Sequence, residues 1–429
     1  MAAGKTIAES NPVLSQPAVA RNLRLQIPLI SILIFVLSMT LYLPTIETRE
    51  FHRDEARWIH RAIYVKELAH PLSDYWDEST WATGESLDHR NRLRAQPPVG
   101  SYVIGLGFLL QGYSLPEIGY WNMDHDTAWN AARDNMPSEE MLKVARRTTA
   151  TITALTAVIL FLIGNRLTSL FGAAAGAIVF AIHPLTEYLA TFAGSDATLV
   201  FFIALSALLA ARLAEKPTWI RTILLGAAIG LGGGVKLSPL GISIALAGVG
   251  VLLLIQKTAK AKKLGIHLIA LPVVAGLTFI LSYPYLWKHP VEHSLNLLRY
   301  RTMSFDLQGS LWDQVAIETR FEAINRIWTR FGSEEWSVLG SVFGWSVPLE
   351  GVLAVIGVFV LAFLVIRRGL GSSTALIAAT IGASTIITVM GMQIDWARYH
   401  FPILLALAIC IGVTIGAIEL WIRRVWVRR

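Results

Sequence analysis

Residues 27–46, IPLISILIFVLSMTLYLPTI, run almost directly into residues 48–58, TREFHRDEARW. The first stretch is apolar over about 20 residues, the length that an α-helix needs to cross a bilayer. The second stretch is densely charged and contains two adjacent carboxylates, Asp54 and Glu55. A carboxylate pair that directly follows a membrane span indicates chemistry at the lipid surface, provided that the rest of the chain is also a membrane protein.

The composition of the whole chain is that of a membrane protein. Its 429 residues are 54% hydrophobic and 16% charged, with a mean hydropathy of +0.52, whereas a soluble domain carries about 25% charged residues. Apolar runs recur at 27–46, 147–165, 171–190, 196–214, 219–235, 238–255, 265–286, 347–366, 374–392 and 400–422. These runs predict an all-α polytopic protein with about ten transmembrane helices in a single domain, residues 27–423.

The net charge of +7 follows membrane topology rather than nucleic-acid binding. Most of the basic excess lies in short clusters beside apolar runs, as topology signals do. We therefore expect membrane lipids as partners and no nucleic acid. The single cysteine, Cys410, lies deep in an apolar run, which excludes a disulfide within the chain and predicts a small buried hydrophobic residue.

The apolar stretch from Val99 to Leu110 decides the topology. It is too short to cross a bilayer comfortably, and if it does not cross, the basic clusters fall on the same side as the N-terminus. Those clusters lie in 1–26, at Arg166, in 212–221, at Lys257–Lys263, at Arg367–Arg368 and in 423–429. Because cytoplasmic loops are enriched in Lys and Arg, we expect cytoplasmic tails at 1–26 and 424–429 and a helix at 99–110 along the outer interface.

Two large polar segments then lie outside the membrane, residues 47–146 and 287–346. Neither has the repetitive or Gly/Ser-rich composition of a linker, so we expect ordered structure in both. Arg53 to Leu68 carries apolar residues at helical spacing with charges between them, which predicts a juxtamembrane amphipathic helix in the first loop. Residues 312–330 predict a similar helix in the second loop.

Most of the unusual polar residues fall at the outer ends of the predicted spans. They are Asp54, Glu55, Gln96-Pro97-Pro98, Arg146-Arg147, Glu187, Asp196, Lys236, the Tyr283–His289 stretch, Asp395 and Arg398. Ionisable residues near lipid are costly and usually face the bundle interior or a water-filled cavity. Their common side of the membrane predicts one outward-facing site.

Each of these residues also has a purely structural interpretation. Asp54 suits either a general base or a helix cap, and Asp196, at the start of a span, leaves the same two interpretations open. Glu55 is more simply a solvated charge in a first helical turn. Lys236 suits either a site or an interfacial snorkelling lysine, and Arg147 is more simply the anchor of a helix end than a ligand.

The motifs and their order resemble a known family. The motifs are RDEARWI at 53–59, AQPPVG at 95–100, Arg147 opening a span, GSDATL at 194–199, GLGGGVK at 230–236 and RYHFP at 398–402. Together they resemble the C-type (GT-C) membrane glycosyltransferase superfamily, and most closely the aminoarabinose transferases of lipid A and the protein O-mannosyltransferases. The resemblance covers residues from about 40 to 410.

The resemblance implies an enzyme that moves a sugar from a polyprenyl-phosphate donor to an acceptor hydroxyl, usually with inversion. Asp54 would be the general base, and Asp196 would orient the acceptor, the sugar or Arg147. Lys236 and Arg398 would hold the lipid phosphate. The further residues expected to bind substrate are Glu55, Gln96, Pro97, Arg147 and Tyr399.

The resemblance also bears on cofactors and location. It implies no certain cofactor, although Asp54 and Asp196 would suit a Mg or Mn ion better than zinc, and the scattered histidines have no metal spacing. The acceptor would be a lipid, a glycan or a protein. We expect the site on the periplasmic or extracellular face of a plasma (inner) membrane.

Two departures from the family keep other interpretations open. Gln96 replaces the usual basic residue or histidine before Pro-Pro, and the segment 111–145 is longer than usual, which could shape an unfamiliar acceptor site. A secondary transporter would explain many spans and buried charge, but we find no internal repeat, and transporters bind near the midplane. A non-catalytic relative is the third interpretation, with Gln96 as its mark.

Overall fold

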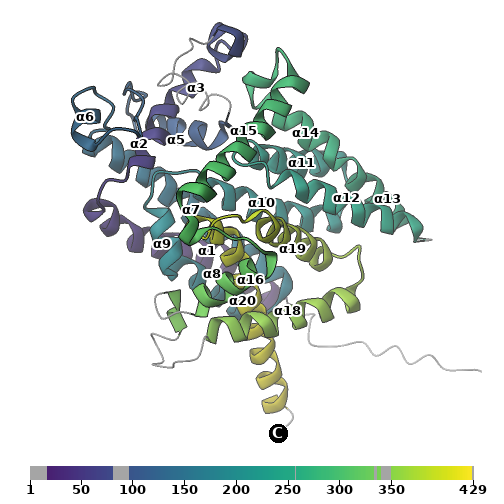
Figure 1. Ribbon diagram of the computed structural model, residues 1–429. Coiled ribbons are helices and arrows are strands. Elements are labelled where there is room, and N and C mark those ends of the chain that lie inside the picture. The colour runs from purple at the N-terminus through teal and green to yellow at the C-terminus, as the bar shows by residue number, and fades with distance from the viewer. Residues whose placement is uncertain (1–16, 81–95, 257, 333–335, 340–348, 428–429) are drawn as a thin grey trace, which may run out of the picture.

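The computed structural model describes residues 17–80, 96–256, 258–332, 336–339 and 349–427, and within these ranges the protein is all-α (Figure 1). Their only β pairing is an isolated bridge between Ala316 and Ile394. The predicted N-terminal tail up to residue 16, Lys257 and the last two residues of the C-terminal tail lie outside the described ranges.

The chain forms long helices joined by shorter ones. The longer helices are α1 (Pro17–Thr48), α5 (Val99–Leu110), α7 (Glu139–Leu167), α8 (Leu170–Ile182), α10 (Asp196–Glu215), α11 (Trp219–Gly233), α12 (Leu240–Ile255), α13 (Ala259–Ile269), α14 (Leu271–Leu281), α15 (Pro290–Leu311), α16 (Arg320–Gly332), α18 (Leu349–Arg368), α19 (Ser373–Gly391) and α20 (Phe401–Val427). The shorter ones are α2 (Arg53–His60), η2 (Arg61–Ile63), α3 (Tyr64–Glu67), η3 (Asp74–Trp76), η4 (Glu78–Thr80), α6 (Thr127–Ala131), α9 (Pro184–Ala190), η5 (Pro284–Leu286), η6 (Asp313–Val315) and η8 (Ala397–His400).

Seven helices in the described ranges are long and apolar enough to cross a membrane, with α13 and α14 counted as one. An eighth forms if α8 and α9, which meet at a 61° bend, make one broken span. The protein is therefore an integral multi-pass membrane protein. The predicted spans at 219–235 and 238–255 correspond to α11 and α12, which have 15 and 16 residues, so the count of ten stays a prediction.

Several turns that were expected in the cytoplasm lead into a helix that begins with a polar N-cap residue. Ser169, Thr218, Thr258 and Ser372 each accept a hydrogen bond from a backbone N–H in the first turn of α8, α11, α13 and α19. Such side chains satisfy the free donors at a helix start. The apolar run sets the length of each span, and the cap sets where it begins.

The centre of the bundle depends on close helix packing. Where α8 crosses α20, a Cβ on Gly172 would lie 2.5 Å from the carbonyl oxygen of Gly412, and one on Gly412 would lie 2.7 Å from that of Gly172. Small residues let membrane helices approach this closely. Cys410 is also buried beside this crossing, as predicted.

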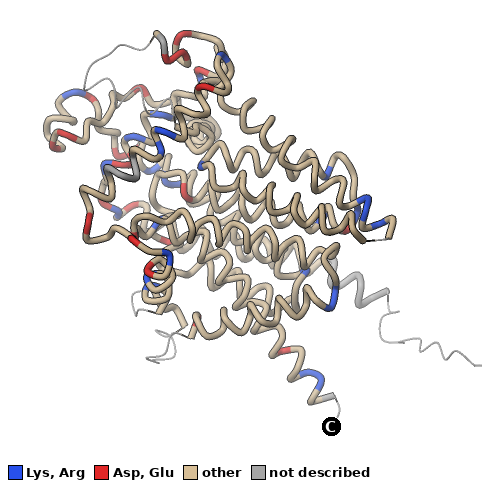
Figure 2. Tube along the Cα trace, turned by 45° about the vertical axis from the view of Figure 1, so that its right-hand side comes forward, with Lys and Arg blue, Asp and Glu red and all other residues tan. Residues whose placement is uncertain are grey.

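The polar segment 47–146 consists of short helices and turns in its described parts. Arg53 to Glu67 is helical and tightens to a 3₁₀ turn at η2, and α5 packs against η2, α3 and α7. Eight residues of α5 are buried, so this helix is covered by protein on most of its surface. Figure 2 shows that charged residues gather at this end of the bundle, with a separate basic group at the far end of α12 and α13.

The second outer loop differs from its prediction. Residues 312–330 do not form one helix, because the backbone of 315–317 pairs with 393–395 and separates η6 from α16. The structure also contains α15, a 22-residue helix that the apolar pattern did not indicate. Its sequence has no continuous apolar stripe, although Pro290 stands at its first position, where proline is favoured.

The α8–α20 crossing predicts a strong asymmetry between two glycine substitutions. Gly412→Leu should lower the thermal unfolding temperature in detergent, because overpacking a tight contact costs about 1–3 kcal/mol. Gly276→Leu is the matched control, since no atom lies within 4 Å of its added Cβ. Equal unfolding temperatures for the two variants would contradict the observed crossing.

Candidate active site

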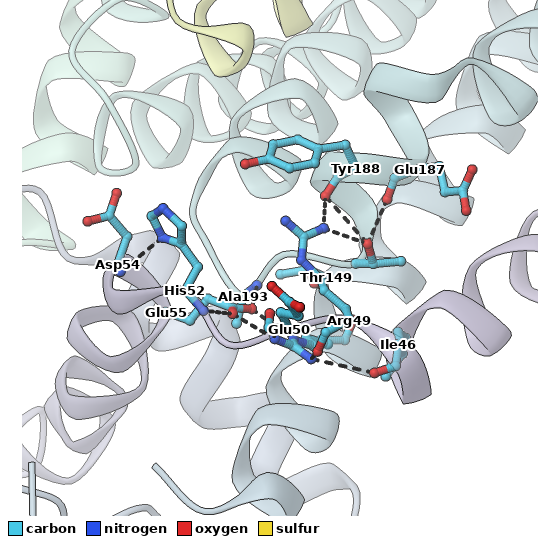
Figure 3. Close-up of polar contacts among 12 residues, drawn as sticks. Ile46, Arg49, Glu50, His52, Asp54, Glu55, Thr149, Glu187, Tyr188 and Ala193 are labelled. Atoms are coloured by element: carbon cyan, nitrogen blue, oxygen red, sulfur yellow. Dashed lines mark hydrogen bonds and ion pairs between the residues drawn. The ribbon is translucent and has the colours of Figure 1, made fainter. Parts of the chain in front are cut away.

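The start of α2 is capped by residues other than Asp54. The Nδ1 atom of His52 accepts a hydrogen bond from the Asp54 backbone N–H at 3.1 Å, and Glu55 Oε2 accepts one from the His52 N–H at 3.1 Å. This reciprocal pair is a capping box. The interpretation of Asp54 as the cap is therefore wrong, and its carboxylate points away from the capping groups (Figure 3).

Glu55 is fully buried and forms an ion pair with Arg146, whose side chain is also buried. Arg146 Nε lies 2.9 Å from Glu55 Oε1, and Arg146 Nη2 lies 2.8 Å from Glu55 Oε2. The Ala193 N–H donates to the same carboxylate at 3.0 Å. The prediction of a solvated Glu55 is wrong, because the partner needed to bury it comes from α7, 91 residues away.

Arg146 also ties this pair to the end of α1. Its guanidinium donates to the carbonyl oxygens of Arg49 at 2.8 Å and Glu50 at 2.9 Å. A buried charge needs this kind of complete pairing. Four segments thus meet around the Glu55–Arg146 pair: the residues after α1, the start of α2, α7 and the Thr191–Ala193 turn (Figure 3).

Five of the predicted site residues come together beside the Glu55–Arg146 pair, namely Asp54, Asp196, Lys236, Arg398 and Tyr399. Arg398 Nη1 lies 3.2 Å from Asp54 Oδ2, and Lys236 Nζ lies 2.5 Å from Asp196 Oδ1. Tyr399 connects the two ion pairs, since its ring centroid is 5.6 Å from both Lys236 Nζ and Arg398 Cζ. Arg398 also interacts electrostatically with Asp196.

The cluster is partly exposed. The side chains of Asp54, Arg398 and Lys236 are 27–28% exposed, whereas that of Asp196 is 7% exposed. Asp196 is the first residue of α10, but its carboxylate binds Lys236.

A glycine turn fixes Lys236 against α5. The Val99 N–H donates to the Gly234 carbonyl at 2.8 Å, and a Cβ on Gly234 would clash with the Val99 side chain. A Cβ on Gly100 would lie 2.8 Å from that of Ser195, directly before Asp196. The glycines are needed because α5, α10 and this turn approach so closely.

Pro97 and Gln96 are held by an arginine that the sequence analysis missed. Arg61 Nη2 donates to the Gln96 carbonyl at 3.1 Å and the Pro97 carbonyl at 2.9 Å, while the Gln96 side chain is exposed. The guanidinium lies 4.8 Å from the ring centroid of Trp58. Arg61 follows Asp54 by seven residues, which is two helical turns, and this spacing was the available signal.

Arg147 lies outside the cluster. Its Nη2 is 3.2 Å from Glu47 Oε1, and both side chains are 40–47% exposed. This contact joins α7 to the end of α1 and supports the interpretation of Arg147 as a helix anchor. The neighbouring Arg146, not Arg147, carries the buried contact.

A second polar cluster joins the two outer loops. Glu78 accepts hydrogen bonds from the hydroxyls of Tyr285 at 2.6 Å and Tyr300 at 2.5 Å. Burial first, and then the hydrogen bond to Glu78, raise the pKa of Tyr285 well above its usual range, so the hydroxyl keeps its proton and donates. Lys288 lies 2.7 Å from Asp77 in the same region.

The described residues contain no group of three or more His, Cys, Asp or Glu side chains that could hold a metal ion. Mg²⁺ is commonly held by one or two carboxylates together with substrate phosphates. Asp54 and Asp196 would be those carboxylates, but each already faces a basic side chain. The donor set therefore fits a cation poorly, and we assign no metal.

The comparison with protein families gives one match. Residues 57–291 match the family described as dolichyl-phosphate-mannose-protein mannosyltransferase. The match covers more than half of the chain and includes Asp196 and Lys236, while Asp54 and Arg398 lie outside it. No curated protein matches the chain.

Two solved structures of an archaeal enzyme show the same fold at low identity. The archaeal oligosaccharyltransferase AglB from Archaeoglobus fulgidus, in complex with an inhibitory peptide and a dolichol-phosphate, matches with a TM-score of 0.53 and 12% identity over 94% of this chain and 51% of that one. The apo form of the A. fulgidus enzyme gives 0.53 and 10% over 93% and 51%. The S. cerevisiae protein O-mannosyltransferase Pmt1-Pmt2 complex bound to the sugar donor gives 0.39 and 15% over 61% and 34%. The chain thus spans about half the length of the archaeal enzyme that it matches.

The adjacent arginines of α7 give a matched test of the buried Glu55–Arg146 ion pair. Arg146→Met should destabilise the protein by about 3–5 kcal/mol, because it leaves the Glu55 charge buried without a partner. Arg147→Met should change stability little, since its partner Glu47 is solvent-exposed. Unfolding of both variants in detergent by a chemical denaturant would measure the difference, and equal losses would refute the assignment of the two arginines.

Proposed function

The chain belongs to the dolichyl-phosphate-mannose-protein mannosyltransferase family, and we propose that it transfers a sugar from a polyprenyl-phosphate donor to an acceptor hydroxyl. The observation that carries the proposal is the pair of adjoining ion pairs, Asp54–Arg398 and Asp196–Lys236. They place a partly exposed carboxylate beside two cations at one end of a membrane bundle. This is the set of charges that the reaction requires.

Asp54 serves as the general base. The acceptor oxygen attacks the anomeric carbon, the bond from that carbon to the phosphate oxygen breaks, and the acceptor proton passes to the Asp54 carboxylate. The reaction is a single displacement in which the acceptor oxygen attacks from the face opposite the leaving phosphate. The configuration of the anomeric carbon is therefore inverted. General-base assistance of this kind contributes about 10²–10⁴-fold to the rate.

Lys236 and Arg398 hold the leaving lipid phosphate. Charge grows on the phosphate as the glycosidic bond breaks, and preorganised cations stabilise that growth best where water is scarce. The planar fork of Arg398 matches two phosphate oxygens, whereas Lys236 acts as a point charge. A bound phosphate competes with Asp54 for Arg398, so donor binding frees the Asp54 carboxylate for the acceptor.

The other predicted residues take supporting roles. Asp196 orients the acceptor or the sugar while it holds Lys236, and Tyr399 forms the wall between the two cations. Gln96 offers a neutral amide to the donor in place of the usual charge, next to Pro97. Glu55 and Arg147 act on the frame of the site and do not touch substrate, because Glu55 is buried and Arg147 pairs with Glu47.

The site faces the periplasmic or extracellular side, with both termini in the cytoplasm. The charge distribution supports this orientation, since a group of basic residues lies at the far end of α12 and α13 (Figure 2). The acceptor is a lipid, a glycan or a protein that presents its hydroxyl at this surface. The donor reaches the cations from within the bilayer, where its polyprenyl chain is dissolved.

Replacement of Asp54 tests the general base. Asp54→Asn should lower sugar transfer or donor hydrolysis by about 10²–10⁴-fold, while the protein still binds polyprenyl phosphate. The assay uses purified protein in liposomes with a panel of radiolabelled polyprenyl-phosphate sugars. Asp124→Asn is the matched control, since that aspartate is exposed in the same outer loop. Release of sugar by Asp54→Asn at the wild-type rate would place the base elsewhere.

The two cations predict a different kinetic result. Lys236→Met and Arg398→Met should each weaken binding of the donor, because each removes a charge that contacts phosphate, by about 5–100-fold. Lys288→Met is the control, since Lys288 pairs with Asp77 in the second polar cluster. The measurement is the donor concentration that gives half-maximal turnover. Unchanged values for both site variants would refute the assignment of the lipid phosphate to Lys236 and Arg398.

A further inference from the structure

The segment that presents Arg398 is held by the second outer loop. The Ile317 N–H donates to the Gln393 carbonyl at 2.8 Å, and the Asp395 N–H donates to the Val315 carbonyl at 2.8 Å. These bonds form a short antiparallel pairing around the Ala316–Ile394 bridge. The chain therefore enters η8 from a fixed position, although residues 392–396 are not themselves helical.

Asp395 is the centre of this contact. Its side chain is 4% exposed, and Arg330 of α16 holds it with Nε at 2.8 Å from Oδ1 and Nη2 at 3.1 Å from Oδ2. The same Nη2 donates to the Asp395 carbonyl at 3.0 Å. His400 Nε2 lies 2.8 Å from the same Oδ1 atom. We call Asp395, Arg330 and His400 the Asp395 brace.

Asp395 stays ionised inside the brace. Burial alone would raise the pKa of its carboxyl, but hydrogen bonds from His400 and Arg330 outweigh burial and lower that pKa to about 2. The brace is thus a charge-assisted contact throughout the physiological range, and such hydrogen bonds are about twice as strong as neutral ones.

The brace encloses the residue that we assign to the phosphate. Asp395 precedes η8 and His400 ends it, so their contact closes the short segment that carries Arg398. A four-residue 3₁₀ helix has little stability of its own. The Arg398 guanidinium also lies 4.4 Å from the ring centroid of Trp396, which stacks on Tyr399 at 6.0 Å and meets Trp312 at 5.3 Å.

We infer that Asp395 is a positioning residue: with Arg330 and His400 it holds η8 so that the Arg398 guanidinium meets the lipid phosphate. This inference rests on the proposed function, because that proposal assigns the phosphate to Arg398. Asp395 itself is buried and contacts no substrate. It couples α16 of the second outer loop to donor binding.

Coupling of this kind is reciprocal. If the brace favours the arrangement of Arg398 that binds phosphate, then bound phosphate favours the closed brace by the same factor. The lipid phosphate should therefore slow hydrogen exchange of the backbone amides of Ile317 and Asp395, which bridge the two segments. A brace that served stability alone would not respond to the ligand.

A double-mutant cycle tests the inference. Asp395→Asn should weaken binding of polyprenyl phosphate by about 5–150-fold, the usual range of a coupling between sites. In the Arg398→Met background the same change should have no further effect, because Asp395 acts through Arg398. Arg326→Met, one turn before Arg330 on α16 and 3.8 Å from Asp395, should cost less than Arg330→Met.

The outcomes separate the inference from the proposed function. An equal loss for Asp395→Asn in both backgrounds would overturn the positioning role, even if turnover still depended on Asp54. A wild-type protein that neither binds polyprenyl phosphate nor transfers sugar would overturn the proposed function itself. If Asp395→Asn does not fold, Arg330→Met breaks the same brace from its partly exposed side and enters the cycle in its place.

Discussion

The buried pair between Glu55 and Arg146 is the contact on which the candidate site depends. It leaves both charges without access to water, and such a pair is tolerated only when every polar atom finds a partner. Those partners are the backbone after α1 and the Ala193 N–H. Asp54 directly precedes Glu55, and Asp196 follows Ala193 by three residues. One buried carboxylate therefore sets the positions of both site carboxylates.

The sequence predicted which segments meet, but not which residue of each adjacent pair forms the buried contact. Asp54 and Glu55 are adjacent, as are Arg146 and Arg147, and adjacent residues of a helix point about 100° apart. Only the packing of α2 against α7 decides which member of each pair is buried. Apolar runs were sufficient for the seven or eight spans found in the described residues, because lipid imposes their length. In contrast, α15 and the 315–317 pairing depend on contacts between distant segments that no local pattern reveals.

Each carboxylate of the cluster faces a cation. Asp54 pairs with Arg398 and Asp196 pairs with Lys236, next to lipid, where an unpaired charge would be costly. These pairs are partly exposed and are therefore weaker than the buried Glu55–Arg146 pair. On the proposed function, an anionic ligand would therefore displace them more easily than it would displace the buried Glu55–Arg146 pair.

The two cations are supported by different outer loops, which has a mechanical consequence. Lys236 is fixed through Gly234 to α5 of the first loop, and Arg398 is fixed through Asp395 to α16 of the second. A phosphate that contacts both cations would bridge the two loops and couple their positions to its own. The charges also lie at one end of the bundle (Figure 2), away from the midplane where a transporter would place its binding site. A site that is held by two loops at one end of the bundle favours chemistry at the membrane surface rather than passage through the bilayer.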